Sequence, residues 1–221
     1  MKKIIFIFLL CLVLFITSTN ASLPLSGKFI VIDAGHGGKD QGTSYQNILE
    51  KNINLEVSKE LEKQLIKNGA SVLLTREGDY DLSTPNASRR KRSDFNNRID
   101  YINASSFDLY LSIHMNYLDN QKYYGAQVFY YDEINKKLAE TIQSELNTIS
   151  YPRSIKKMPD IYMYQYLKMK GVLIECGFIS NEKERKQLLT KEYQEKLAKT
   201  ITKAIINFYN WFYIVIILEY F

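Results

Sequence analysis

Residues 29–42, "FIVIDAGHGGKDQG", decide how the rest of the sequence is interpreted. The first four residues are apolar and either aromatic or β-branched, which is typical of a buried strand. A glycine-rich turn follows at once and carries His36, one of only two histidines in the chain. Because glycine allows tight turns at no steric cost, this turn can bring the main chain close to an ion or a ligand.

Beyond this stretch, short apolar segments alternate with helical patterns, which is typical of an α/β domain. The predicted strands are 28–33, 71–75, 107–114, 125–130 and 171–175. Apolar residues at helical spacing predict helices between the first two strands, over 133–149 and from Tyr193 to Phe208. The polar segments 76–94 and 150–169 are predicted to be irregular, with the length of loops that line a substrate site.

The N-terminal segment differs from the rest of the chain. Two lysines precede thirteen consecutive apolar residues, 4–16, and small residues follow up to Ala21. A membrane-spanning helix needs about 20 apolar residues, so residues 1–21 are predicted to be a signal peptide, with an uncleaved membrane anchor as the alternative. We therefore expect an exported protein that meets the membrane only through this segment, if it stays attached.

The net charge limits the kinds of molecule that the protein is expected to bind, and the cysteine content limits its disulfides. The net charge is +5, and +3 without Lys2 and Lys3 (27 basic against 24 acidic residues). A mildly basic exported protein meets anionic wall polymers rather than nucleic acid. The "RRKR" run at 89–92 is interpreted as a solvated loop or helix start. Outside the N-terminal segment only Cys176 remains, which excludes an internal disulfide.

The C-terminal residues 209–221 include "WFYIVIILEYF", whose apolar core is too short to cross a bilayer. We interpret them as an over-long final helix that packs on the domain or on a partner. The predicted catalytic domain is therefore 22–208. The tyrosines within 123–131 and 162–166 are interpreted as packing residues in preference to sugar-stacking residues.

Three of the predicted strands end in, or lead directly to, reactive side chains: His36, His114 and Glu175. Ligands of open α/β sheets bind outside the carboxyl ends of the strands, so these groups are expected to converge. A catalytic zinc normally takes three protein ligands. Glu50 is the candidate third ligand because it begins the first helix at the same edge, although a carboxylate there also suits the helix dipole. Glu56 and Glu60, farther along that helix, are expected to be exposed.

Four ordered segments carry a resemblance to a known family: "VIDAGHGGKDQG", "LEKNINLEV", "RIDYINASSFDLYLSIHMN" and "GVLIECGFISN". Together they resemble the zinc-dependent N-acetylmuramoyl-L-alanine amidases, over residues 28–208. "TREGDYDLS" and "SRRKRSDFNNR" are most similar to the germination-specific, CwlD-type branch of spore-forming bacteria. The resemblance implies a twisted, mostly parallel sheet of about six strands with helices on both faces.

The resemblance also implies roles for particular residues. His36, Glu50 and His114 match the family's zinc ligands, and Glu175 matches its catalytic glutamate. Arg98 and Asn116 match motif positions near the site, where they are candidate substrate-binding residues. The implied substrate is peptidoglycan, cut between the lactyl group of N-acetylmuramic acid and L-alanine.

The implied setting is the cell wall or the forespore intermembrane space, during spore cortex maturation. Some clostridial relatives work with a lipoprotein partner. Two alternatives stay open at this point: a non-catalytic peptidoglycan-binding module, and a zinc peptidase that cuts within the stem peptide.

Overall fold

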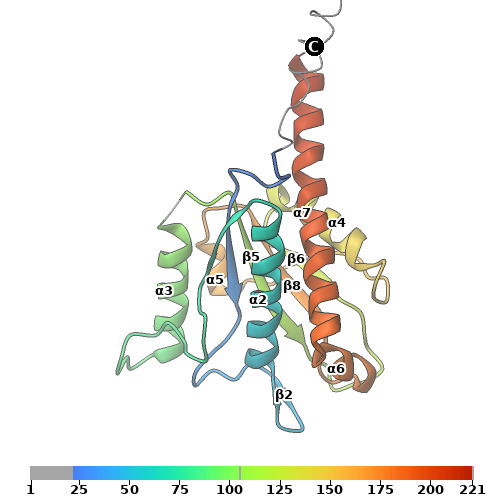
Figure 1. Ribbon diagram of the computed structural model, residues 1–221. Coiled ribbons are helices and arrows are strands. Elements are labelled where there is room, and N and C mark those ends of the chain that lie inside the picture. Colours follow the sequence, from blue (N-terminus) through green and yellow to red (C-terminus); the bar gives the residue numbers. More distant parts are fainter. Residues whose placement is uncertain (1–21, 105, 221) are drawn as a thin grey trace, which may run out of the picture.

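The computed structural model describes residues 22–104 and 106–220, with side chains described as far as Trp211. Its centre is a six-stranded sheet in the order β4-β1-β5-β8-β6-β7 (Figure 1). The first four of these strands are parallel neighbours, whereas β6 runs antiparallel to β8 and parallel to β7. The predicted mostly parallel sheet of about six strands is therefore confirmed. The strands are β1 (Phe29–Ala34), β4 (Ser71–Leu74), β5 (Leu109–Asn116), β6 (Gln127–Tyr130), β7 (Lys156–Lys157) and β8 (Gly171–Phe178).

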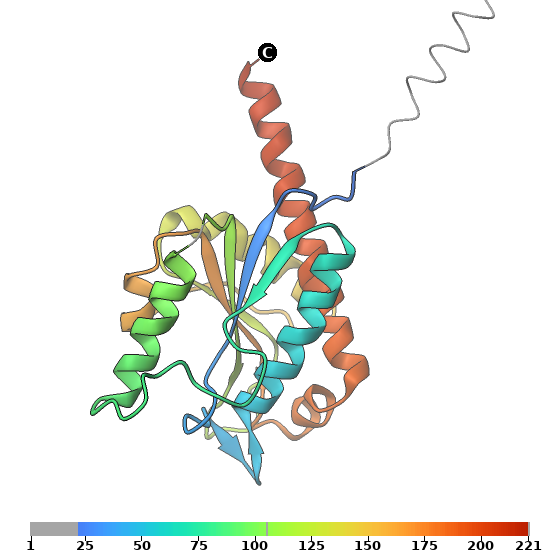
Figure 2. The same cartoon turned by 60° about the vertical axis from the view of Figure 1, so that its left-hand side comes forward.

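Helices cover both faces of the sheet, as expected (Figures 1 and 2). Alternate residues of a strand point to opposite faces, so Ile30 and Ile32 pack on one side while Val31 packs on the other. The first face carries α2 (Glu50–Lys67), α4 (Lys136–Leu146) and α7 (Lys191–Tyr220). The second face carries α3 (Arg90–Asn103) and α5 (Tyr162–Gln165).

Smaller elements complete the fold. A hairpin of β2 (Ser44–Tyr45) and β3 (Ile48–Leu49) joins the glycine-rich turn to α2. A 3-10 turn, η1 (Glu133–Asn135), begins the segment predicted as a helix over 133–149. The short helix α6 (Glu182–Leu188) follows β8.

The two segments predicted as irregular contain more regular structure than expected. Helix α3 begins at Arg90, so the basic run at 89–92 is a helix start. The segment 150–169 contains β7 and α5. Both segments nevertheless contribute residues to pockets of the molecule.

The prediction that Glu60 is exposed is wrong, whereas Glu56 is exposed as expected. Helix α7 packs alongside α2 and leaves Glu60 only 8% exposed. The Glu60 carboxylate keeps an ion pair with Lys63, at 2.7 Å. A charged side chain is thus buried on a helix that packs beside a later helix, far away in sequence.

Helix α7 is long, and its C-terminal part extends beyond the sheet on the side where β1 begins (Figure 1). Within the described residues, no helix combines the length and hydrophobicity needed to cross a bilayer. Residues 1–21 lie outside the described part of the chain, so the signal peptide stays a prediction. The same holds for what the side chains beyond Trp211 contact.

Candidate active site

Three side chains meet at the carboxyl edge of the sheet. His36 follows β1, Glu50 is the first residue of α2, and His114 lies near the end of β5. Oε1 of Glu50 lies 3.2 Å from Nε2 of His36 and 3.0 Å from Nδ1 of His114. One possible ligand atom from each of the three residues lies within 4.8 Å of the others. The structure therefore brings together the three residues that the sequence singled out.

The chemistry of this donor set suits zinc. Two imidazole nitrogens and one carboxylate oxygen match the combination found in catalytic zinc sites. Donors about 2.0–2.1 Å from a tetrahedral ion lie roughly 3.3 Å apart. The separations of 3.0 and 3.2 Å from the Glu50 oxygen are close to that spacing. The residues present therefore fit a zinc ion.

Two glycines explain why the turn after β1 is glycine-rich. A Cβ atom on Gly35 would lie 2.3 Å from the His114 ring. A Cβ atom on Gly42 would lie 2.5 Å from the Glu50 carboxylate and 2.7 Å from the His36 ring. Both positions exclude any larger residue, because side chains of the donor set occupy the space.

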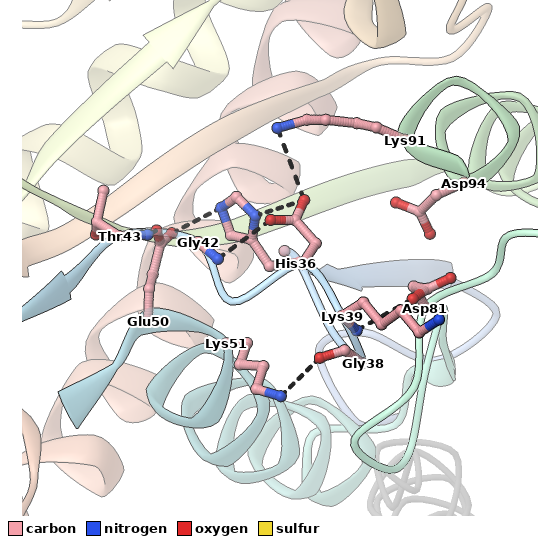
Figure 3. A network of polar contacts seen from close by, with 12 residues as sticks. His36, Gly38, Lys39, Gly42, Thr43, Glu50, Lys51, Asp81, Lys91 and Asp94 are labelled. Atoms are coloured by element: carbon pink, nitrogen blue, oxygen red, sulfur yellow. Dashed lines mark hydrogen bonds and ion pairs between the residues drawn. The ribbon is translucent and has the colours of Figure 1, made fainter. Parts of the chain in front are cut away.

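The His36 ring is held from its other side. Asp40 Oδ2 lies 3.1 Å from Nδ1 of His36, while Nε2 faces Glu50. Lys91 approaches the same Asp40 oxygen at 3.7 Å, which Figure 3 shows as a dashed line from Lys91. A carboxylate on the second ring nitrogen fixes the tautomer and the orientation of a metal-binding histidine.

The backbone of His36 is unusual, because its φ of 61° lies in the left-handed region. Nη2 of Arg98 donates to the His36 carbonyl at 2.6 Å and holds this conformation. The same guanidinium binds Asp33 at 2.6 Å and Asp94 at 3.0 Å. Arg98 and Asp33 are both almost fully buried. Burial alone would raise the pKa of Asp33, but the positive charge of Arg98 outweighs it and holds the pKa below its usual value.

Two further cations hold the turn, and the sequence did not reveal them. The buried Arg76 donates to the carbonyls of Ala34 at 2.9 Å and Gly35 at 3.0 Å. Nζ of Lys51 donates to the Gly38 carbonyl at 2.7 Å (Figure 3). Arg76 directly follows a predicted strand, and Lys51 directly follows the candidate ligand Glu50. These positions in the sequence were the only indication that the two residues lie near the site.

Glu175 lies in β8, one strand away from His114, with which it is paired in register. Its Oε2 atom is buried and has no hydrogen-bond partner among the described residues. Burial, together with the charge of Glu50, raises the pKa of Glu175 to about 8. An orphaned buried carboxyl group in a cleft is a candidate acid or base.

His36 and His114 of the donor set share one cleft of about 260 Å³ with Glu175, whereas Glu50 contacts both rings but does not line the cleft. Phe95 of α3, together with Ile161 and Met163 at α5, supplies an apolar wall. His36, His114 and Glu175 supply the reactive groups. The cleft thus combines a donor set for a metal with a carboxyl group that holds or releases a proton.

The electrostatics of the donor set favour a protonated His36 beside an ionised Glu50. Burial opposes protonation of His36, but hydrogen bonds with Asp40 and Glu50 outweigh it and raise the His36 pKa to about 9. Burial likewise opposes ionisation of Glu50, but the two histidines hold its pKa far below its usual value. In the metal-free protein the positive charge of protonated His36 therefore balances the negative charge of Glu50.

The two candidate substrate-binding residues differ in position. Arg98 lines the cleft, although the interactions described above engage its guanidinium with the protein itself. Asn116 ends β5, beyond an irregularity in the pairing with β8, and its carbonyl accepts from the N–H of Ile179. It is not among the residues that line the cleft. A substrate contact of either residue stays a prediction.

Known proteins are similar to this chain over most of its length. A family model described as N-acetylmuramoyl-L-alanine amidase matches residues 30–207. The germination-specific N-acetylmuramoyl-L-alanine amidase of Bacillus subtilis (strain 168) is 43% identical over 196 residues, which is 86% of this chain and 83% of that relative.

Solved structures show the same fold. The CwlD amidase of Clostridioides difficile, in complex with the GerS lipoprotein, is 37% identical with a TM-score of 0.80, over 83% of this chain and 99% of that one. The amidase AmiC2 of Nostoc punctiforme is 28% identical with a TM-score of 0.73, over 84% of this chain and 99% of that one. The chain therefore belongs to the N-acetylmuramoyl-L-alanine amidase family and is an enzyme of that class.

Proposed function

We propose that this protein hydrolyses peptidoglycan with a zinc ion held by His36, Glu50 and His114. The bond cut is the amide between the lactyl group of N-acetylmuramic acid and L-alanine. The observation that carries the proposal is the convergence of His36, Glu50 and His114, whose two histidines line one cleft with Glu175 in a chain of the amidase family.

Each residue has a role in the proposed reaction. When bound, zinc lowers the pKa of water to about 7 and polarises the scissile carbonyl. Glu175 takes the proton of the attacking water and passes it to the amine of L-alanine as the C–N bond breaks. The negative charge of Glu50 is one of the two causes that raise the pKa of Glu175. A cation held by the donor set would offset that charge and lower the pKa, so that Glu175 is ionised and able to accept a proton. Asp40 orients His36 through its Nδ1 atom.

The reaction is tested by digesting purified sacculi with the protein and identifying the new chain ends by mass spectrometry. We expect free amino groups on L-alanine with glycan strands left intact. A chelator should abolish these products, and added zinc should restore them. Cuts inside the stem peptide would instead identify a peptidase, and digestion that survives the chelator would refute the zinc site.

We further propose that the reaction serves spore cortex maturation, where removal of the stem peptide precedes formation of muramic-δ-lactam for germination. Its support is the 43% identity to the germination-specific amidase of Bacillus subtilis. The test is expression of this chain in a Bacillus subtilis strain that lacks its own germination-specific amidase. Restored muramic-δ-lactam in the cortex is expected, and a cortex without it contradicts the assignment.

The proposed setting is extracytoplasmic, at the cell wall or in the forespore intermembrane space. We also propose a lipoprotein partner, because the similar CwlD amidase of Clostridioides difficile was solved with the GerS lipoprotein. The comparison that tests it is sacculus digestion by this protein with and without the corresponding lipoprotein of its own source. Equal rates, together with separate elution in gel filtration, would contradict the partnership.

A further inference from the structure

A second pocket, of about 440 Å³, lies beside the start of β6. Its lining includes Gln127 together with three cations and three tyrosines: Lys122, Arg153, Lys156, Tyr123, Tyr124 and Tyr151. None of its lining residues belongs to the donor set or to the cleft of Glu175. The proposed reaction therefore leaves this pocket unexplained.

The register of the sheet places the second pocket next to the active site. Gln127 of β6 is the direct partner of Glu175 in β8. Paired residues of neighbouring strands project to the same face, and the strands lie about 4.8 Å apart. Nε2 of Gln127 donates to the Ser154 carbonyl at 2.7 Å, which joins segment 151–156 to the sheet. The second pocket thus begins one strand away from Glu175.

The backbone around Arg153 is fixed before any ligand arrives. The side chain of Asn147 accepts from the Arg153 N–H and donates to its carbonyl, both at 3.0 Å. Gly125, with φ at 101°, allows the chain to approach closely, because a Cβ there would lie 2.6 Å from the Tyr151 carbonyl. Nη1 of Arg153 donates to the Tyr124 carbonyl at 3.0 Å.

The pocket carries an excess of positive charge, although Arg153 also interacts with the nearby Glu184 carboxylate and lies 5.2 Å from the centre of the Phe178 ring. Within the described part of the chain, no carboxylate lines it, and Lys122, Arg153 and Lys156 form no ion pair within 4.0 Å. Nε of Arg153 is buried and has no hydrogen-bond partner among the described residues. The neighbouring Glu184 carboxylate accepts instead from the backbone N–H groups of Gly125 and Phe178, each at 2.8 Å.

We propose that this pocket binds a free carboxylate of the stem peptide, with Arg153 as its principal partner. The inference rests on the proposed function, because it assigns the peptide side of the scissile bond to this pocket. On the glycan side the lactyl carboxyl group is consumed in the amide, whereas the peptide side carries free carboxylates. Arg is suited to carboxylates because its guanidinium offers parallel N–H donors. The rings of Tyr124 and Tyr151, 4.5 Å apart, form an apolar wall beside it.

The first test measures binding without turnover. Two stem tripeptides are titrated calorimetrically: one with free carboxylates and one with all of its carboxylates amidated. We expect R153Q to weaken the free peptide about 10-fold, K122Q and K156Q to weaken it less, and the amidated peptide to be weak and insensitive to all three. The control is K157Q, since Lys157 follows Lys156 in β7 and projects to the opposite face.

Three results would contradict the proposal that this pocket binds a carboxylate. These are equal affinity of the wild type for both peptides, no detectable binding of the free peptide, or equal effects of K157Q and K156Q. Because Lys122 and Lys156 are exposed, K122Q and K156Q keep the test valid if R153Q does not fold.

The second test uses muropeptide substrates with the same two stems. R153Q should raise KM about 10-fold for the free-carboxylate substrate, with kcat little changed, and should leave KM for the amidated substrate unchanged. If both substrates are cut equally well by wild type and R153Q, the pocket is refuted while the proposed function stands. If the wild type binds the free peptide selectively but cuts neither substrate, the pocket stands and the proposed function fails.

Discussion

Oε1 of Glu50 lies 3.0 Å from Nδ1 of His114, although 64 positions separate the two residues. The same oxygen accepts from the N–H of Met115 at 3.2 Å, and the other oxygen accepts from the N–H of Thr43 at 2.8 Å. Backbone donors from β5 and from the glycine-rich turn therefore hold Glu50 in position. The donor set is assembled by the fold itself, so an ion has little reorganisation to impose.

The Glu50 carboxylate should dominate zinc affinity. E50Q replaces the charged donor with a neutral amide, and we expect zinc affinity to fall by more than about 100-fold. The control is E56Q, which changes an exposed glutamate of the same helix. Competition titration against a chelator measures both variants. Equal affinities for E50Q and E56Q would exclude Glu50 as a ligand.

Glu175 should separate catalysis from metal binding. E175Q keeps the shape of the side chain but removes its ability to take a proton. We expect zinc content to stay at the wild-type level while kcat falls about 10²–10⁴-fold. E182Q, at an exposed position of α6, serves as the control. Near-normal turnover in E175Q would end the assignment of Glu175 as the base.

Zinc binding should release a proton. The pKa of His36 is about 9 in the metal-free protein, so its ring is protonated at pH 7, whereas a metal needs the neutral imidazole. Glu175, with a pKa of about 8, also loses its proton when a cation binds, so affinity should rise more steeply than tenfold per pH unit below pH 8, about tenfold per unit from pH 8 to 9, and then level off. D40N removes a partner that raises the pKa of His36, so it should release fewer protons than the wild type at pH 7. Calorimetry in buffers of different ionisation enthalpy counts the protons, and an identical count for wild type and D40N would contradict the prediction.

The metal-free protein should lose stability as pH rises from about 4.5 to 8, because of Glu175. Its folded pKa of about 8 exceeds the usual 4.5, so folding disfavours the ionised form. E175Q has no such penalty, and its advantage over wild type should grow across this window to about 4 kcal/mol. Urea denaturation in the presence of a chelator, at pH 5 and pH 8, measures the difference. A difference that does not change with pH would contradict the shifted pKa.

Much of the fold could be predicted because its strands are apolar and short. All five predicted strands correspond to strands of the sheet within a few residues. Helix α3 was not predicted, and its buried residues explain why: Asp94 and Arg98 lie inward beside Ile99 and Ile102. A buried face that is half charged gives no hydrophobic periodicity.

Buried charged residues also limited how much of the site could be predicted from the sequence. His36, His114 and Glu175 were identifiable because they interrupt or follow apolar strands. Arg76 and Lys51 were not, since a buried cation that binds backbone carbonyls has the same sequence signature as a solvated surface charge. Their role depends on where the turn after β1 lies, and that is a property of the folded chain.

Arg98 should support both stability and the metal site. R98M leaves Asp33 buried with its charge unpaired, which is expected to cost about 3–5 kcal/mol in the free energy of unfolding. R98M/D33N should recover part of that loss, because the uncompensated charge is removed, but zinc affinity should stay low since the His36 carbonyl has lost its donor. R92M, at an exposed position of the same helix, should cost less than about 1 kcal/mol. Urea denaturation and zinc titration measure the two effects. Recovery of zinc affinity in the double variant would show that Arg98 stabilises Asp33 alone and does not position His36.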